Sequence, residues 1–177
     1  MRLLLTAALF LAPALAAQAQ TETPAAKDEV VIEGVGLSRE IPCDGQNIGI
    51  YGADNTIHLS GNCANVVVHG DGHTVTMQQV QSLAVSGAEH VVTADSLEAL
   101  SVDTTENTVT ATIKSEAAPA TVLLNGADQT LNLTIASETT IDVAGTGQVV
   151  NWSVAPSIAE PRINMSGIDN AVNRVDG

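Results

Sequence analysis

Aromatic and basic residues are scarce in this chain. Phe, Trp and Tyr occur once each, and six Lys and Arg residues stand against 20 Asp and Glu residues, for a formal net charge of −14. So few aromatic side chains cannot build platforms that stack bases or sugar rings. An acidic chain without clustered Lys and Arg also cannot neutralise phosphates. We therefore expect no nucleic-acid partner.

Long apolar runs are absent after the first residues. Arg2 precedes an apolar run from Leu3 to Leu15, and Ala17-Gln18-Ala19 has the small-x-small form of a signal-peptidase site. A membrane anchor is the alternative, but the run is shorter than the roughly 20 residues of a span. We expect residues 1–19 to be a cleaved signal peptide, with no transmembrane segment afterwards. Five basic and 20 acidic residues then remain, so the exported protein, periplasmic or extracellular, carries −15.

Cysteine is limited to Cys43 and Cys63. An oxidising compartment would join this pair in a disulfide. Closing a loop of about 20 residues should stabilise the fold by roughly 3 kcal/mol in the chain-entropy model. Two free thiols or half of a metal site are the alternatives.

The abundant residues, Val, Thr, Asn, Ala and Gly, form an internal repeat. Two types of alternating segment follow each other. The first type starts at Asn47, Asn65, Ser82, Ala99, Thr121, Thr140 and Arg162. The second type starts at Asn55, His73, His90, Asn107, Gln129, Gln148 and Asn170. The step from first to second type is always eight residues, and a full cycle takes 17 to 22 residues.

This constant step predicts an all-β fold, a two-sheet parallel β-solenoid whose insertions fall on one edge. Residues 20–29 form a flexible leader and residues 30–177 one solenoid domain, in which Val30 to Val35 is a capping strand. An antiparallel β-meander in a sandwich or barrel is the alternative. Gly is frequent at the first position of the constant turn, where it permits a positive φ.

Period-two alternation predicts which side chains face the core. The first type of strand should bury Ile48/Ile50, Val66/Val68, Leu83/Val85, Leu100/Val102, Val122/Leu124, Ile141/Val143 and Ile163/Met165. The second type should bury Ile57/Leu59, Val75/Met77, Val92/Ala94, Val109/Ala111, Leu131/Leu133, Val150/Trp152 and Val172, with Arg174 breaking the pattern at the last inward site.

Several local motifs match a known family. They are Cys43-Asp-Gly, Gly52-Ala-Asp-Asn55-Thr-Ile57, Ser60-Gly-Asn-Cys63, Val66-Val-Val68-His-Gly70 and Val80-Gln-Ser-Leu83-Ala-Val85-Ser-Gly87. Over about residues 30–113 the chain resembles the bacterial secreted "domain of unknown function 3060" family. His73 and His90 depart from the family pattern, which favours Asn. The resemblance implies fold and export, and it implies no catalytic residues because the family has no assigned activity.

Three groups of polar residues are candidate sites. His69, Asp71, His73 and His90 could bind a divalent transition metal, although unliganded turn residues are the ordinary explanation. Glu89, Glu106 and Asp128 should form an acidic column on the constant turn, which could attract Ca²⁺ or simply be solvated. The third group is a Thr-rich outward face that could meet ice or polysaccharide, although Thr suits any exposed strand. It contains Thr74, Thr76, Thr93, Thr108, Thr110 and Thr130.

Catalysis is not indicated by any motif. The chain lacks a Ser-His-Asp signature, a phosphate loop and a CxxC pair. We expect a non-catalytic module without cofactor that presents a rigid surface to an unidentified protein or surface partner. Surface or ligand binding at the acidic and His turn or at the Thr-rich face is the alternative. We also expect a monomer, because its net charge repels like molecules.

Overall fold

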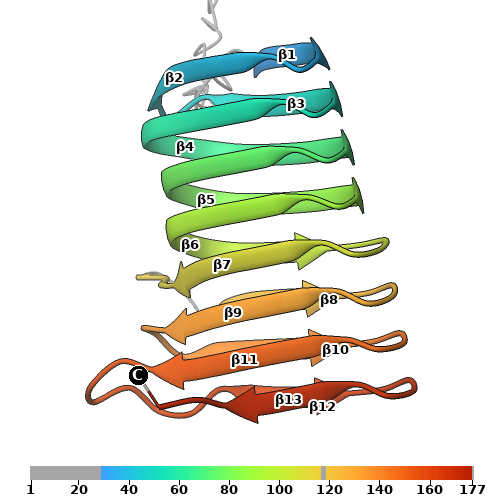
Figure 1. Cartoon of the computed structure of the whole chain (residues 1–177). Helices are drawn as coiled ribbons and strands as arrows, with labels where there is room; N and C mark the ends of the chain where they lie inside the picture. Colours follow the sequence, from blue (N-terminus) through green and yellow to red (C-terminus); the bar gives the residue numbers. More distant parts are fainter. Residues whose placement is uncertain (1–28, 117–118, 177) are drawn as a thin grey trace, which may run out of the picture.

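The computed structural model describes residues 29–116 and 119–176, and the expected signal peptide and most of the leader lie outside them. Thirteen strands and no helix make up this part of the chain (Figure 1). The strands are β1 (Glu29–Val35), β2 (Ser38–Asp44), β3 (Asn47–Ala53), β4 (Thr56–Asp71), β5 (Thr74–Ala88), β6 (Val91–Val102), β7 (Thr108–Ile113), β8 (Ala120–Leu124), β9 (Thr130–Ile135), β10 (Thr139–Val143), β11 (Val149–Val154), β12 (Arg162–Met165) and β13 (Ala171–Arg174).

Every strand pairing is parallel, so the expected solenoid is confirmed and the antiparallel meander is wrong. About eight coils stack on one another. One face consists of β1, β3, the later parts of β4, β5 and β6, and then β8, β10 and β12. The other runs from β2 through β4–β7, β9 and β11 to β13. Because β4, β5 and β6 each run through both faces, all thirteen strands join in one wound sheet.

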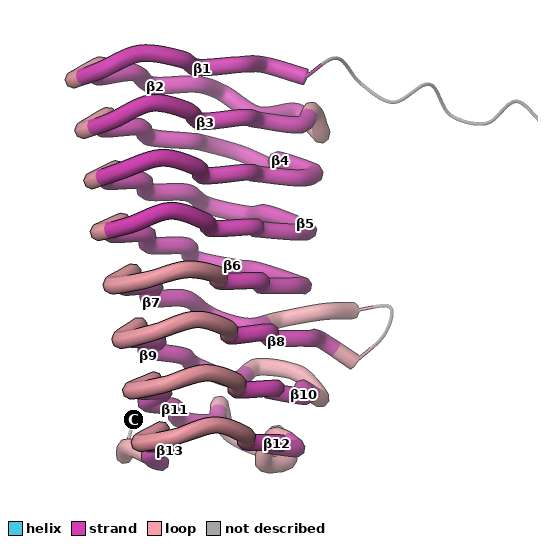
Figure 2. The backbone as a smooth tube through the Cα atoms, turned by 90° about the vertical axis from the view of Figure 1, so that its right-hand side faces the viewer, coloured by secondary structure: helices cyan, strands magenta, loops and turns pink. Residues whose placement is uncertain are grey.

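The constant turns lie along one edge of the stack and the longer connections along the other, as the repeat spacing predicts (Figure 2). The constant turn has a similar backbone conformation in successive coils. Gly87 has a φ of 111°, and an added Cβ there would lie 2.0 Å from the carbonyl oxygen of Gly70. Neighbouring coils therefore approach closely at this position, which explains the column of glycines.

The core register agrees with the sequence prediction in every coil except the last. Ile50, Val68, Val109 and Leu131 are each 0% exposed, and the other predicted inward residues from Ile48 to Trp152 are also buried. The last coil is different, because no further coil covers it within residues 29–116 and 119–176. Ile163 and Met165 are 37% and 58% exposed and Val172 is half-buried, so their predicted burial is wrong.

The structure adds two features to the prediction. A further set of core residues lies beyond the second strand type, on the edge of variable length, and includes Val80, Leu97, Ile113 and Ile135. The capping segment is also a complete first coil, because β1 pairs with β3 over seven residues and β2 pairs with β4 over another seven.

Cys43 and Cys63 form the expected disulfide, with their Cα atoms 5.0 Å apart. Cys43 is in β2 and Cys63 is in β4, one coil further along. The bond therefore ties the first coil to the second, and both cysteines pack in the core.

Candidate functional site

A buried column of polar side chains follows the constant turn through the stack. Its members lie immediately before β4, β5, β6, β7, β9, β11 and β13. They are Asn55, His73, His90, Asn107, Gln129, Gln148 and Asn170, here named the polar ladder. All but Asn170 are 0% exposed. Buried polar groups are ordinarily hydrogen-bonded, and among the described residues Gln129 Oε1 is the one buried side-chain nitrogen or oxygen atom without a partner.

The ladder residues bond the backbone in a repeated way. The side chain at each of five positions accepts a bond from the backbone N–H of the ladder residue one coil earlier, as when His73 N–H donates to His90 Nδ1 at 3.1 Å. Each side chain also pairs its other end with the carbonyl four residues earlier; for His90 this is Ser86 at 3.1 Å. The ladder thus fixes each turn to its neighbour.

These bonds set the protonation state of His90. Its Nδ1 accepts a hydrogen bond, so Nε2 carries the proton donated to Ser86 and the ring is neutral. The His73 ring stacks on it at 5.0 Å between centroids and 3° between planes. Burial lowers the pKa of His90 below the usual 6.5, the nearby His73 acts in the same direction, and the Ser86 carbonyl and Asp71 oppose it.

We expect the protein to lose stability as the pH falls below about 6.5, the usual histidine pKa. Below that pH the unfolded chain binds a proton at His90 that the folded state resists, so the contribution is full above it and declines towards the lowered folded pKa. Urea unfolding at neutral pH and at pH 5 measures the difference. The variant His90→Asn should reduce it, whereas His58→Asn at an exposed site should not. An unchanged difference in His90→Asn would contradict this role.

The four candidate metal ligands do not form a single ligand set, although His73 and His90 stack on each other. His73 and His90 have both ring nitrogens engaged with the backbone. His69 faces solvent beside Ser86, with Nδ1 2.9 Å from Oγ, and Asp71 is exposed on the turn. Within residues 29–116 and 119–176, no group of three or more His, Cys, Asp or Glu side chains could hold a metal ion.

The acidic residues on the turn share a left-handed backbone conformation. Glu89, Glu106 and Asp128 have φ values of 58°, 58° and 54°, and all three are exposed. Gly72 and Gly147 occupy the same turn position in two other coils and share this left-handed conformation. The three carboxylates are exposed and lie on separate coils, which agrees with a solvated edge.

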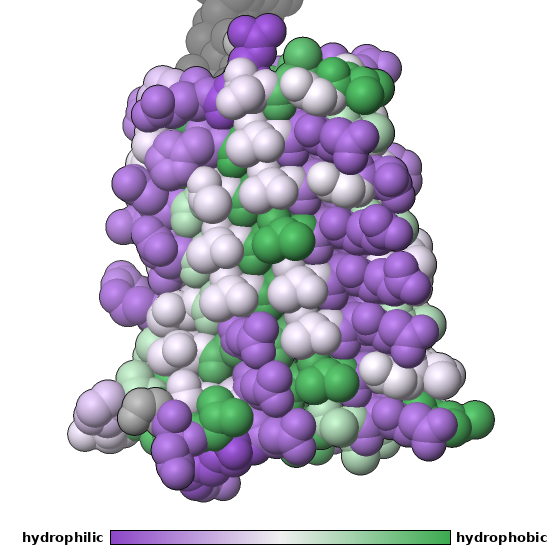
Figure 3. All heavy atoms as spheres, in the orientation of Figure 1, coloured by the Kyte–Doolittle hydropathy of each residue, from purple (hydrophilic) through white to green (hydrophobic). Residues whose placement is uncertain are grey.

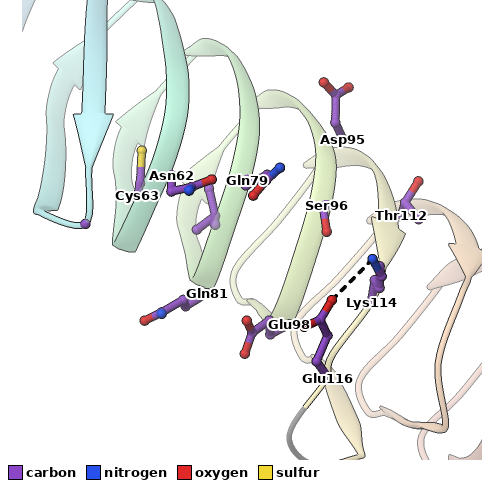
Figure 4. Close-up of a pocket in the computed structure, with 12 residues that line it drawn as sticks. Asn62, Cys63, Gln79, Gln81, Asp95, Ser96, Glu98, Thr112, Lys114 and Glu116 are labelled. Carbon is purple, nitrogen blue, oxygen red and sulfur yellow. Dashed lines mark ion pairs between the residues drawn. The ribbon is translucent and has the colours of Figure 1, made fainter.

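A hollow of about 500 Å³, the edge pocket, lies at the opposite edge of the stack (Figure 4). Amides and carboxylates line it, including Asn62, Gln79, Asp95 and Glu98. Lys114 Nζ is 3.5 Å from Glu116 Oε1, and both side chains are more than half exposed. An exposed ion pair of this kind contributes little stability. The pocket lining carries three carboxylates, Asp95, Glu98 and Glu116, against the single ammonium group of Lys114, so its net charge is negative.

The six predicted threonines do share one face, formed by the outward side chains of β4–β7, β9, β11 and β13 and here named the hydroxyl face. Register places them in two adjacent columns. The first contains Thr56, Thr74, Val91, Thr108, Thr130, Val149 and Ala171. The second contains His58, Thr76, Thr93, Thr110, Asn132, Asn151 and Asn173.

Figure 3 shows near-neutral side chains along the upper and middle part of this face, with hydrophobic side chains among them and hydrophilic side chains in the lower coils. From β4 to β13 the two columns contain no Asp, Glu, Lys or Arg, although the chain carries −14; one coil earlier, Glu40 of β2 pairs in register with His58 and bounds this uncharged stretch. In the lower coils the amides join in a ladder, in which Asn151 Nδ2 donates to Asn132 Oδ1 at 3.0 Å. The face is therefore uncharged and rich in groups that both donate and accept hydrogen bonds.

A groove of about 380 Å³, here named the axial groove, crosses this face along the stack. The second column forms one bank from Thr93 to Asn151. The other bank and the floor were not predicted from the sequence. The other bank contains Asp95, Thr112, Thr134 and Ser153, and the floor contains Ala94, Ala111 and Leu133. The groove spans four coils, roughly 14 Å at about 4.8 Å per coil.

The sequence contains a signal for the second bank. Thr112 and Thr134 continue the period-two alternation two residues beyond Thr110 and Asn132, and register pairs them with each other and then with Ser153. Extending the alternation by one more step would have found both this bank and the core residues Ile113 and Ile135 beneath it.

No helix in the described part of the chain is long and apolar enough to cross a membrane. No curated protein and no solved structure matches the chain. Residues 50–93 match a family model, in the part of the stack that runs from β3 to β6 and contains the His73–His90 stack and the upper hydroxyl face. The expected resemblance is thus confirmed over these residues, where the chain is similar to the family described as "Protein of unknown function (DUF3060)".

Proposed function

We propose that this chain is an exported, non-catalytic solenoid module that binds an extended, uncharged polysaccharide along its hydroxyl face. The observation that carries the proposal is the axial groove, whose banks repeat once per coil. A linear polymer of hydroxylated units presents the same pattern, a hydrogen-bonding group at each regular step. The disulfide and the signal-like first residues support export.

Charge selects among possible polymers. The banks offer hydroxyl and amide groups, and Asp95 is the single charged residue that lines the axial groove. An anionic polymer would meet the field of a protein with a net charge of −14 and would be repelled. A neutral glycan avoids this repulsion and can exchange its bonds with water for bonds to Thr and Asn.

Shape separates a polymer from a planar lattice such as ice. A lattice plane would need a flat array of equivalent groups, whereas the face is hollowed between its second column and Thr112, Thr134 and Ser153. The Thr columns are also broken by Val91 and Asn132. A chain lying in the groove requires neither flatness nor identical residues.

We expect the protein to co-sediment with an insoluble neutral glucan whose chains are separate, such as swollen amorphous cellulose, and to bind the anionic polymers alginate and polygalacturonate much less. The variant Thr110→Glu should lower the bound fraction at least about tenfold, because it places a charge in the middle of the groove. Thr110 is exposed, so its replacement should change stability by less than about 0.5 kcal/mol.

The matched control is Thr121→Glu, an exposed threonine of β8 on the opposite face. It should bind as the parent protein does. Equal loss in both variants, or no binding to any neutral glycan, would contradict the proposal. Inhibition of ice growth without glycan binding would assign the face to ice instead.

A further inference from the structure

The last coil leaves a sheet edge without a neighbour. Strand β12 pairs with β10, and β13 pairs with β11, and both have a partner on one side alone among the described residues. Core positions are uncovered as a result. Met165 is 58% exposed, whereas Val143, which pairs with it one coil earlier, is 2% exposed. An open edge with apolar side chains is a surface on which another strand can pair.

The partner that this edge fits is a second copy of the same chain. The first coil has the same strand pattern as the later ones. Strand β1 of one copy could therefore pair in parallel with β12 of another copy, in the register that joins neighbouring coils within one chain. Gly167 would then lie over Gly34, which has the same positive φ range. Three further pairs match in character in that register: Arg162 with Glu29, Ile163 with Val30 and Met165 with Ile32.

Two arginines oppose this stacking. Arg39 pairs in register with Ile57, and Arg174 pairs with Trp152, so each occupies an inward position of the second face. The six residues between the ends of each column are apolar and buried. Arg174 now avoids the core, because its guanidinium lies 5.6 Å from the Trp152 ring and pairs with exposed Glu160.

We propose that Arg39 and Arg174 are stops that prevent copies of this chain from stacking end to end. In the stacked register Arg39 would lie over Val172 and Arg174 over Ile41, so each guanidinium would enter an apolar core with no carboxylate at an inward position beside it. A buried charge without a partner is strongly unfavourable. Inward-pointing charges are one of the ways in which natural sheets protect their edges.

The test is the double variant Arg39→Ile/Arg174→Leu in the chain from residue 20 onward. Light scattering should show single copies for the parent protein at all concentrations. The double variant should form particles whose mass grows many-fold with concentration, and electron microscopy should show them as threads of stacked coils.

Two matched variants keep the result specific. Arg162→Leu removes a charge from the same end at an outward position, and Arg39→Lys/Arg174→Lys keeps positive charge at both inward positions. Both should remain single copies. Threads of the parent protein, a double variant that stays single, or threads of the Arg162→Leu control would each overturn the proposal. Amorphous aggregates of the double variant without the circular dichroism of parallel β-structure would overturn it as well.

Discussion

Replacing Val68 with aspartate is expected to destabilise the protein by about 3 kcal/mol or more. Val68 is 0% exposed in β4, between Ile50 of the preceding coil and Val85 of the next. A carboxylate there would lie in the apolar core without a hydrogen-bond donor. The urea midpoint of unfolding measures the loss.

The neighbouring variant Val67→Asp is the control, because alternation turns this side chain to the outside between Gly49 and Ala84. We expect a loss below about 1 kcal/mol for this partly exposed site. Equal losses in the two variants, or a larger loss for Val67→Asp, would show that the inward and outward faces of β4 are assigned wrongly.

The second large effect is expected when the polar ladder is broken at Asn107. Its Oδ1 accepts from His90 N–H at 3.1 Å, and its Nδ2 donates to the carbonyls of Gly87 at 3.1 Å and Asp103 at 3.3 Å. The variant Asn107→Leu has a similar volume but leaves the buried His90 N–H without its partner and removes one hydrogen bond from each of the two carbonyls, which keep bonds to Thr104 and Thr105. Since an unsatisfied buried donor costs about 1–3 kcal/mol and each lost hydrogen bond about 0.5–1.5 kcal/mol, we expect a total loss of about 2–4 kcal/mol.

The variant Asn107→His provides the matched rescue. Histidine occupies the same ladder position in the two preceding coils and makes the same two kinds of bond there. Its thermal midpoint should therefore lie close to that of the parent protein and well above that of Asn107→Leu. Similar midpoints for the Leu and His variants would mean that side-chain volume, rather than hydrogen bonding, governs this position.

The sequence predicted the core register because the physical rule behind it is local. Alternation at Val75 and Met77, or at Leu131 and Leu133, decides the buried face whichever coil lies above or below. Burial of the last coil depends instead on a further coil packed against it, and the described residues supply none, so Ile163 and Met165 fit the pattern and are still exposed.

The polar ladder shows a different limit. Its residues were visible as a column, but a polar residue at a turn is ordinarily exposed. Burial of Gln129 and His90 follows from the close stacking of turns, which the repeat period alone does not give. The metal hypothesis rested on the proximity of His73 to His90, and the two rings do stack. It did not consider the backbone N–H and carbonyl groups that hydrogen-bond the nitrogens of both rings and so leave none free for a metal.

The hydroxyl face was predictable as a set of threonines, and the axial groove was not. Its threonine bank follows from alternation at Thr93 and Thr110. Its depth depends on how the chain continues to Thr112 and Thr134, beyond the alternating residues that define the second type of strand in the repeat. Tertiary geometry thus converts a Thr-rich surface into a linear site.

Binding of neutral glucan oligosaccharides of increasing length, followed by amide chemical shifts, tests the proposed function most directly. The account predicts shifts confined to β6, β7, β9 and β11 and an affinity that rises with length until the sugar spans the four coils of the axial groove. Shifts centred on the edge pocket or on β8 and β10, or an affinity independent of length, would contradict it.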